Sequence, residues 1–130
     1  MAELPQLSNG EMEVARVIWE LKDASLGEIY SAFASEREGD YSTVQTYVRR
    51  LEAKGYVESR REGRGKRYRP KVAPRHVIRR TLTDLVDRLF GGQAMPLMRH
   101  LIEDKGISRK EIAELRELLD RFEEQSHDAP

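Results

Sequence analysis

Cysteine is absent from this 130-residue sequence, and so are long apolar runs. Without thiols the chain has no disulfide framework, no thiolate metal site and no cysteine nucleophile. No segment approaches the roughly 18 consecutive apolar residues that a membrane-spanning helix requires. The first residues also lack the basic end and the apolar stretch of a secretory signal. These absences predict a soluble cytoplasmic protein that has no membrane segment.

Histidine is scarce, since His76, His100 and His127 are the only imidazoles and lie far apart without a ligand cluster. Carboxylates are plentiful in the first 40 residues, but no base, nucleophile or phosphate-binding loop accompanies them. Solvated helix surfaces explain these carboxylates better than an active site does. We therefore predict no enzyme activity, no metal site and no cofactor.

The charges are balanced in number but not in position. Residues 1–40 carry three basic and nine acidic side chains, residues 41–71 ten and three, and residues 72–130 ten and eleven. The net charges of these blocks are therefore −6, +7 and −1. A strongly basic block in a neutral chain indicates a surface for a polyanion, although a solvated basic surface would have the same composition.

Helix signals divide the first 55 residues into three helices. Ser8 with Glu11, and Ser25 with Glu28, have the spacing of capping boxes, which predicts a helix start at each serine. A third helix follows Asp40, with one buried stripe at the spacing i, i+3, i+4 and i+7 and a glycine to end it. The stripe consists of Val44, Tyr47, Val48 and Leu51, and the glycine is Gly55.

Two short extended segments, residues 56–60 and 66–69, flank the turn sequence Glu62-Gly63-Arg64-Gly65 and predict a β-hairpin. We expect Tyr68 to pack inward on the core. Three helices followed by a hairpin is the order of a winged helix-turn-helix domain, to which we assign residues 1–72. The fold class is mainly α with a small β-hairpin wing.

The remaining residues predict further helices. A fourth helix begins at Pro74 and ends at Gly91-Gly92, a fifth ends at Lys105-Gly106, and a sixth opens at Ser108 with a third capping box. Apolar seams with a period near 3.5 residues indicate helix-on-helix packing over residues 73–123, and residues 124–130 are expected to form a flexible tail. The apolar positions are Ile78, Leu82, Leu85, Leu89, Leu97, Leu101, Ile112, Leu115, Leu119 and Phe122.

The outward face of the third helix is suited to reading base edges. At about 100° per residue, this face combines hydroxyls, an amide, arginines and an alanine, and its positions from 42 to 50 contain no acid. Gln pairs with adenine, Arg with guanine, and a Thr methyl packs on the thymine methyl. An ordinary polar helix surface would instead carry Glu and Lys. The face comprises Ser42, Thr43, Gln45, Thr46, Arg49, Arg50 and Ala53.

The hairpin adds six basic side chains within ten residues, which after a recognition-type helix indicates a wing that contacts phosphates or the minor groove. They are Arg60, Arg61, Arg64, Lys66, Arg67 and Arg69.

With these segments in place, the chain resembles the penicillinase-repressor family, which includes the BlaI and MecI repressors and the copper-responsive CopY relatives. The resemblance runs from Leu7 to about Leu119. The matching segments are Ser8–Trp19 (SNGEMEVARVIW), Ser42–Gly55 (STVQTYVRRLEAKG), Lys66–Pro70 (KRYRP), Leu89–Gly92 (LFGG) and Ile107–Leu119 (ISRKEIAELRELL).

The resemblance implies a homodimeric repressor of double-stranded DNA that binds an inverted-repeat operator and dimerises through the carboxy-terminal seams described above. It places base contacts at Thr43, Gln45 and Thr46, and wing contacts at Arg64, Lys66 and Arg67. The predicted DNA-binding residues are therefore Ser42, Thr43, Gln45, Thr46, Arg49, Arg50, Arg64, Lys66 and Arg67.

The resemblance also implies that repression ends when the dimer is lost. In the β-lactam-responsive members a sensor metalloprotease cuts an Asn-Phe bond, and the corresponding bond here is His100-Leu101. The copper-responsive members use a cysteine-rich tail that this chain lacks, so the inducer stays open. Two other functions fit the same fold: a ligand- or metal-responsive regulator with the same DNA-binding surface, and a winged helix used for protein–protein contact.

Overall fold

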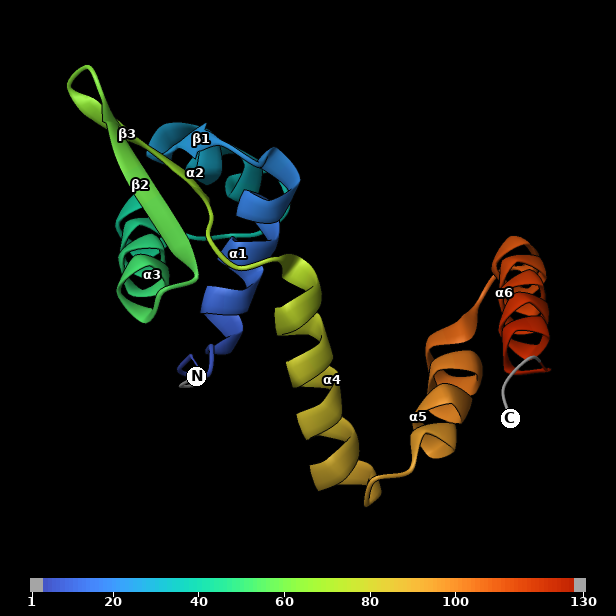
Figure 1. Ribbon diagram of the computed structural model, residues 1–130. Helices are drawn as coiled ribbons and strands as arrows, with labels where there is room; N and C mark the ends of the chain where they lie inside the picture. The colour runs from blue at the N-terminus through green and yellow to red at the C-terminus, as the bar shows by residue number, and fades with distance from the viewer. Residues whose placement is uncertain (1–3, 128–130) are drawn as a thin grey trace. The chain divides into compact units, whose positions relative to one another are not determined.

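A three-stranded sheet and three helices form the amino-terminal part of the computed structural model, which describes residues 4–127 (Figure 1). Further helices follow, including one π-helix, η1. The chain divides into two compact units, one ending at Arg80 and the other beginning at Thr81. The elements are α1 (Asn9–Leu21), β1 (Ala24–Ser25), α2 (Leu26–Ala34), α3 (Tyr41–Lys54), β2 (Val57–Glu62), β3 (Gly65–Pro70), α4 (Pro74–Phe90), α5 (Ala94–His100), η1 (Leu101–Gly106) and α6 (Arg109–His127).

The capping boxes predicted at the starts of α1 and α2 are confirmed. Ser8 and Ser25 each accept a hydrogen bond from the backbone N–H of the glutamate three residues on, and that glutamate accepts one in return. Helix α3 starts after Asp40, which makes no side-chain cap, and ends at Gly55 with a φ of +90°. This left-handed conformation is the reason that a glycine stands there.

The sheet has one strand more than the predicted hairpin. Its strand order is β1-β3-β2, and β1 pairs antiparallel with β3 through Ala24 opposite Tyr68. A strand of two residues has no periodicity that the sequence could reveal. The tight reversal predicted at Glu62-Gly63-Arg64-Gly65 is confirmed, because Glu62 pairs with Gly65 and only two residues remain in the turn. Gly63 has a φ of +61°, which the first position of a type II′ turn requires.

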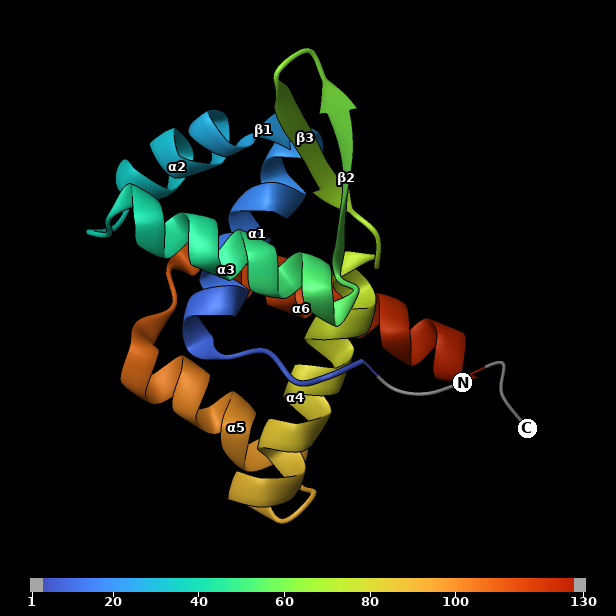
Figure 2. The same ribbon diagram turned by 90° about the vertical axis from the view of Figure 1, so that its left-hand side faces the viewer.

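One hydrophobic core joins the three helices to the sheet. Three residues of the predicted stripe of α3 lie inside it, since Val44, Val48 and Leu51 are at most 1% exposed. The fourth, Tyr47, is only half-buried and packs against this core. Tyr68 is buried, as expected, and Val77 from the first turns of α4 also packs on this core. The first unit therefore extends past residue 72, where the sequence placed the domain boundary, and includes the start of α4. The wing projects beyond the helices in both views (Figures 1 and 2).

The second unit is built of helices with little interior of their own. The predicted fifth helix is divided into α5 and the π-helical η1. The third capping box is confirmed, because the Glu111 N–H donates to Ser108 Oγ at 3.1 Å. Helix α6 continues to His127, four residues into the predicted tail, and residues 128–130 lie outside the described residues. From Ile78 to Ser126 no residue is buried.

An ion pair between the buried Glu11 and the half-buried Lys54 joins the start of α1 to the end of α3. Glu11 is 1% exposed, and its Oε1 accepts hydrogen bonds from Ser8 N at 2.7 Å and from Lys54 Nζ at 2.6 Å. Lys54 Nζ also donates to the carbonyl of Gln6 at 2.8 Å. Burial acts to raise the pKa of Glu11, but the Lys54 and Ser8 donors outweigh it and the pKa lies below the ordinary 4.5. This pair fixes the end of α3 against the start of α1.

We expect Glu11→Ala to lower the free energy of unfolding by about 1–3 kcal/mol, because it removes the return bond of the cap and leaves Lys54 with one acceptor fewer. Denaturant unfolding measures this change. The control is Glu20→Ala, since Glu20 forms an exposed ion pair with Arg16 and should contribute under about 1 kcal/mol. Equal losses in the two variants would contradict the role of the buried pair.

The same pair predicts a pH dependence. Because the pKa of Glu11 is lower in the folded chain than in the unfolded chain, the unfolded chain takes up the proton more readily. The stabilisation is fully present above about pH 4.5 and is lost as the pH falls through the lower, folded pKa. Unfolding curves at several pH values between neutral and acid should therefore converge for the wild type and Glu11→Ala. A difference that stays constant down to the lowest pH would contradict this.

Candidate nucleic-acid interface

Helix α3 presents a polar face opposite its buried stripe. Five of its predicted contact residues are exposed and Gln45 is half-buried. Thr46 Oγ1 donates to the carbonyl of Ser42 at 2.9 Å, so its hydroxyl proton is used within the helix while an acceptor oxygen and a methyl group remain. No acidic residue occurs between positions 41 and 51. The exposed residues are Ser42, Thr43, Thr46, Arg49 and Arg50.

Strand register determines which wing side chains lie on the face of the hairpin that is turned toward α3. Residues directly opposite each other in an antiparallel pair lie on one face, and residues two apart on a strand return to it. Ser59 is opposite Tyr68, and Arg61 is opposite Lys66. All four side chains therefore lie on one face of the hairpin, whereas Arg67 lies on the other.

The face that carries Tyr68 is the one turned toward α3. Ser59 Oγ donates to the Glu52 carboxylate of α3. Burial raises the pKa of Tyr68 above its ordinary value, and the charge of Glu52 acts in the same direction. Arg61 and Lys66 continue this face past the end of the core toward the wing tip, where Arg64 stands in the turn (Figure 2).

Ion pairs divide the basic residues of the wing in the same way. Arg69 Nε donates to Glu58 Oε1 at 2.7 Å, and Arg60 Nη1 to Asp23 Oδ2 at 2.7 Å. Arg67 is bound most completely, by Asp23 and by Glu28. All three arginines are on the face away from α3. By contrast, five basic residues of α3 and the wing form no ion pair with any residue from 4 to 127: Arg49, Arg50, Arg61, Arg64 and Lys66.

The candidate interface therefore consists of the outer face of α3, the wing tip and the α3-side face of the wing. It contains Arg61, which the predicted site omitted, and its cations are free to meet an anionic ligand. Arg67, which the prediction included, has its guanidinium group occupied within the protein. Side chains alternate between the two faces of a strand, so the inward position of Tyr68 places Lys66 and Arg61 on one face and Arg67 on the other. This alternation is the sequence signal that could have distinguished them.

The other predicted site residues lie in the second unit, except Ile78, which stands near the end of the first. His100 and Leu101 stand at the junction of α5 and η1, and both are exposed. His100 Nδ1 lies 2.5 Å from Asp104 Oδ2, and its ring centroid lies 5.9 Å from that of Phe90. Across residues 4–127, no helix is long and apolar enough to cross a membrane, and no three His, Asp or Glu side chains gather as a metal ligand set.

Comparison with known proteins gives consistent relatives. A family model described as Penicillinase repressor matches residues 7–121. The Penicillinase repressor of Bacillus licheniformis is 28% identical over 120 residues, which cover 92% of this chain and 94% of the relative. The Methicillin resistance regulatory protein MecI of Mammaliicoccus sciuri is 26% identical over 116 residues, covering 89% and 94%.

Two solved structures match the first unit. The DNA-binding domain of the repressor BlaI aligns with a TM-score of 0.52 and 31% identity, covering 57% of this chain and 90% of that chain. The monomeric form of Bacillus licheniformis BlaI in complex with the blaP half-operator aligns with a TM-score of 0.50, also at 31% identity and with the same coverage.

The division of the wing cations predicts which of them affect DNA affinity. Arg61→Ala and Lys66→Ala should each weaken binding to any duplex and reduce the slope of log affinity against log salt by about one, because each loses one phosphate contact. Arg69→Ala is the matched control, since Arg69 lies on the opposite face and is held by Glu58. Fluorescence anisotropy over a range of salt concentrations measures the slopes. A slope lowered as much by Arg69→Ala as by Lys66→Ala would refute the assignment.

Proposed function

The chain belongs to the penicillinase repressor family, and from this premise we propose that it represses transcription as a homodimer on an inverted-repeat operator. Members of this family are transcriptional regulators and not enzymes, and the chain is a DNA-binding transcriptional repressor. The proposal adds the form of the operator, the residues that read it, the dimer, and the way in which repression ends.

The proposed DNA contact is supported mainly by the distribution of paired and unpaired basic residues over α3 and the wing. Five cations of α3 and the wing that have no ion-pair partner within residues 4–127 lie on α3, on the α3-side face of the wing and at the wing tip, and they border the acid-free surface of α3. A duplex is the polyanion that matches a helix and a wing arranged in this way. The solved complex of the related BlaI with a half-operator supports this choice of partner.

Within this interface the helix selects the sequence and the wing supplies charge. Gln45 and Arg49 have side chains that hydrogen-bond base edges, and the Thr46 methyl can pack on thymine. Thr43 and Ser42 are small, which allows the start of α3 to lie deep in the major groove. The wing contacts phosphates through Arg61, Arg64 and Lys66, which fix the register without reading sequence. Arg50, at the edge of the outer face of α3, has the same role.

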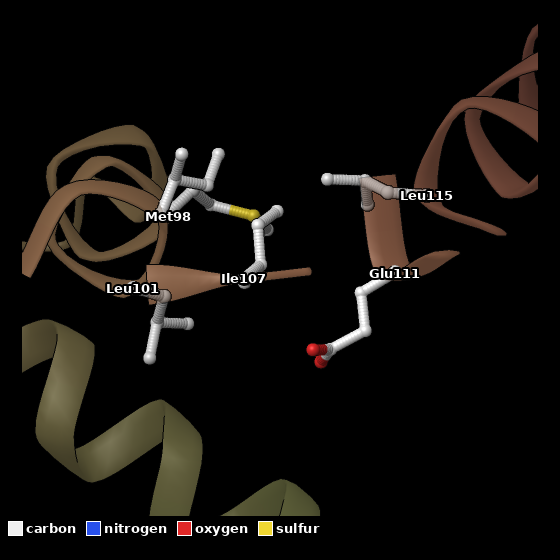
Figure 3. Close-up of a pocket in the computed structure, with 6 residues that line it drawn as sticks. Met98, Leu101, Ile107, Glu111 and Leu115 are labelled. Carbon is white, nitrogen blue, oxygen red and sulfur yellow. The ribbon is translucent and has the colours of Figure 1, made fainter. Parts of the chain in front are cut away.

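We place the dimer contact in the carboxy-terminal helices because these helices do not bury their own apolar side chains. Apart from Leu21 and Tyr41, every exposed large hydrophobic side chain of the described residues lies at or after Ile78. A cavity of about 210 Å³ lined mainly by apolar side chains opens between η1 and α6, where Met98 and Ile107 point toward Leu115 (Figure 3). Exposed apolar patches of this kind mark association surfaces. The proposed seam is Ile78, Leu82, Leu85, Leu89, Leu97, Leu101, Ile112, Leu115, Leu119 and Phe122.

Dimerisation would also govern the release of DNA. One winged helix makes few contacts, and two of them on half-sites about one helical turn apart combine their binding energies. A cut at the exposed His100-Leu101 bond would separate the seam of α4 and α5 from that of α6 and would break the dimer. We propose this bond as the position at which a sensor metalloprotease would end repression.

The readout assignment predicts that Arg49→Glu abolishes operator binding, because it places a carboxylate against the phosphates at the centre of the interface. Lys110→Glu makes the same charge reversal on α6, on the side opposite the apolar seam, and should bind as the wild type does. The operator is first selected by the wild-type chain from a random-sequence duplex pool, and gel shifts then compare the variants. Unchanged binding by Arg49→Glu would refute the assignment of α3.

The dimer assignment predicts that Leu119→Glu combined with Phe122→Glu yields a folded monomer, because both side chains are more than half exposed in the single chain and would be buried in the dimer. Sedimentation equilibrium measures the mass, and circular dichroism confirms that the helices persist. The control, Arg121→Gln with Lys110→Gln, changes the net charge by the same amount on the opposite side of α6 and should remain dimeric. A double glutamate variant that stays dimeric would contradict the seam.

A further inference from the structure

A cluster of charged side chains occupies the face of the wing turned away from α3. It joins two wing arginines to acids that come from the wing itself, from the connection between α1 and α2, and from α2. The cluster comprises Arg60, Arg67, Asp23, Glu28 and Glu62. Its arginines belong to the basic block, yet, like Arg69, they have partners inside the protein.

Asp23 is the centre of this cluster. Its Oδ1 accepts from Arg67 Nε at 2.8 Å and its Oδ2 from Arg60 Nη1 at 2.7 Å, while its backbone carbonyl accepts from Arg67 Nη2 at 3.0 Å. The chain reaches this position through Lys22, which has a φ of +69°, and then enters β1 beside β3. The two arginines hold the pKa of Asp23 below its ordinary value, so it is an anion at neutral pH.

The carboxylate of Asp23 thus accepts from guanidinium donors that could otherwise bind a phosphate group. Guanidinium groups bind carboxylates and phosphates with the same donors, so one acceptor excludes the other. Asp23 and Arg60 are both more than one-third exposed, and exposed ion pairs of this kind add little to the stability of a fold. Their larger effect is on what the two arginines can bind.

We propose that Asp23 is a positioning residue for DNA recognition, which holds Arg60 and Arg67 away from phosphates and so keeps the sequence-independent affinity of the wing low. This inference rests on the DNA contact proposed for the wing. Glu28 takes part through its contact with Arg67 Nη1 at 3.2 Å, in addition to its role in the capping box of α2.

The consequence concerns the sequence-independent part of the affinity. Every phosphate contact that is added strengthens operator and non-operator duplexes alike and carries no sequence information. It also makes log affinity steeper against log salt by about 0.9. Release of Arg60 and Arg67 would therefore raise the affinity for both kinds of duplex and leave the ratio of operator to random-sequence affinity unchanged.

The test uses the full chain with Asp23→Asn, an operator selected from a random pool, and a random duplex of equal length. We expect random-duplex affinity to rise about 5-fold or more at low salt and the salt slope to steepen by about one to two. Operator affinity should rise by a similar factor, so that the operator-to-random ratio stays near that of the wild type. The matched control is Glu13→Gln, which makes the same charge change and frees Arg37 from an exposed ion pair; its slope should equal that of the wild type.

A second variant distinguishes two effects of Asp23→Asn, the release of Arg67 and structural damage to the wing. Adding Arg67→Ala to Asp23→Asn should return the slope toward that of the wild type, and Arg67→Ala alone should leave it unchanged. If Asp23 were only structural, Asp23→Asn would bind more weakly at an unchanged or shallower slope. That result would overturn the inference. A salt slope reduced by about one in Arg67→Ala alone would also overturn it. This second measurement does not require that Asp23→Asn folds. A wild-type chain without salt-dependent affinity for any duplex would instead overturn the proposed function itself.

Discussion

Tyr68 packs between the sheet and α3, and the two-residue period of a strand extends the effect of that single contact to the whole wing. Because Tyr68 is buried, Lys66 and the opposite Arg61 must lie on the α3 side, and Arg67 on the other. A register shift of one residue would exchange these faces and turn the internally paired arginines toward the DNA. The positive surface thus depends on a core contact as well as on the number of basic residues.

Two sets of ion pairs determine how α3 is held and which cations of the wing are neutralised. The buried pair of Glu11 and Lys54 holds the end of α3 against α1, so the recognition helix and the core keep one geometry. On the far face of the wing, Asp23 and Glu58 neutralise arginines that would otherwise add charge without sequence information. The first unit therefore separates five cations of α3 and the wing that have no ion-pair partner among the described residues from three wing arginines that the protein neutralises itself.

Local signals in the sequence were sufficient for the fold, because capping boxes and a helical stripe act over a few residues. The serines at 8, 25 and 108 and the stripe ending at Leu51 are found where they were predicted. The strand β1 could not be predicted, since two residues have no period. The pairing of Arg67 with Asp23 joins residues 44 apart and follows only from the sheet that brings β1 beside β3. Composition alone could not separate Arg61 from Arg67.

The most direct measurement is a titration of the full chain with a short random-sequence duplex, followed through the arginine Nε–Hε signals in NMR spectra. The account predicts large shifts for Arg49, Arg61 and Arg64, and signals for Arg67 and Arg69 that stay near their free positions. Shifts of Arg67 and Arg69 as large as that of Arg61 would contradict the division of the wing into a face that binds DNA and a face that is neutralised from within.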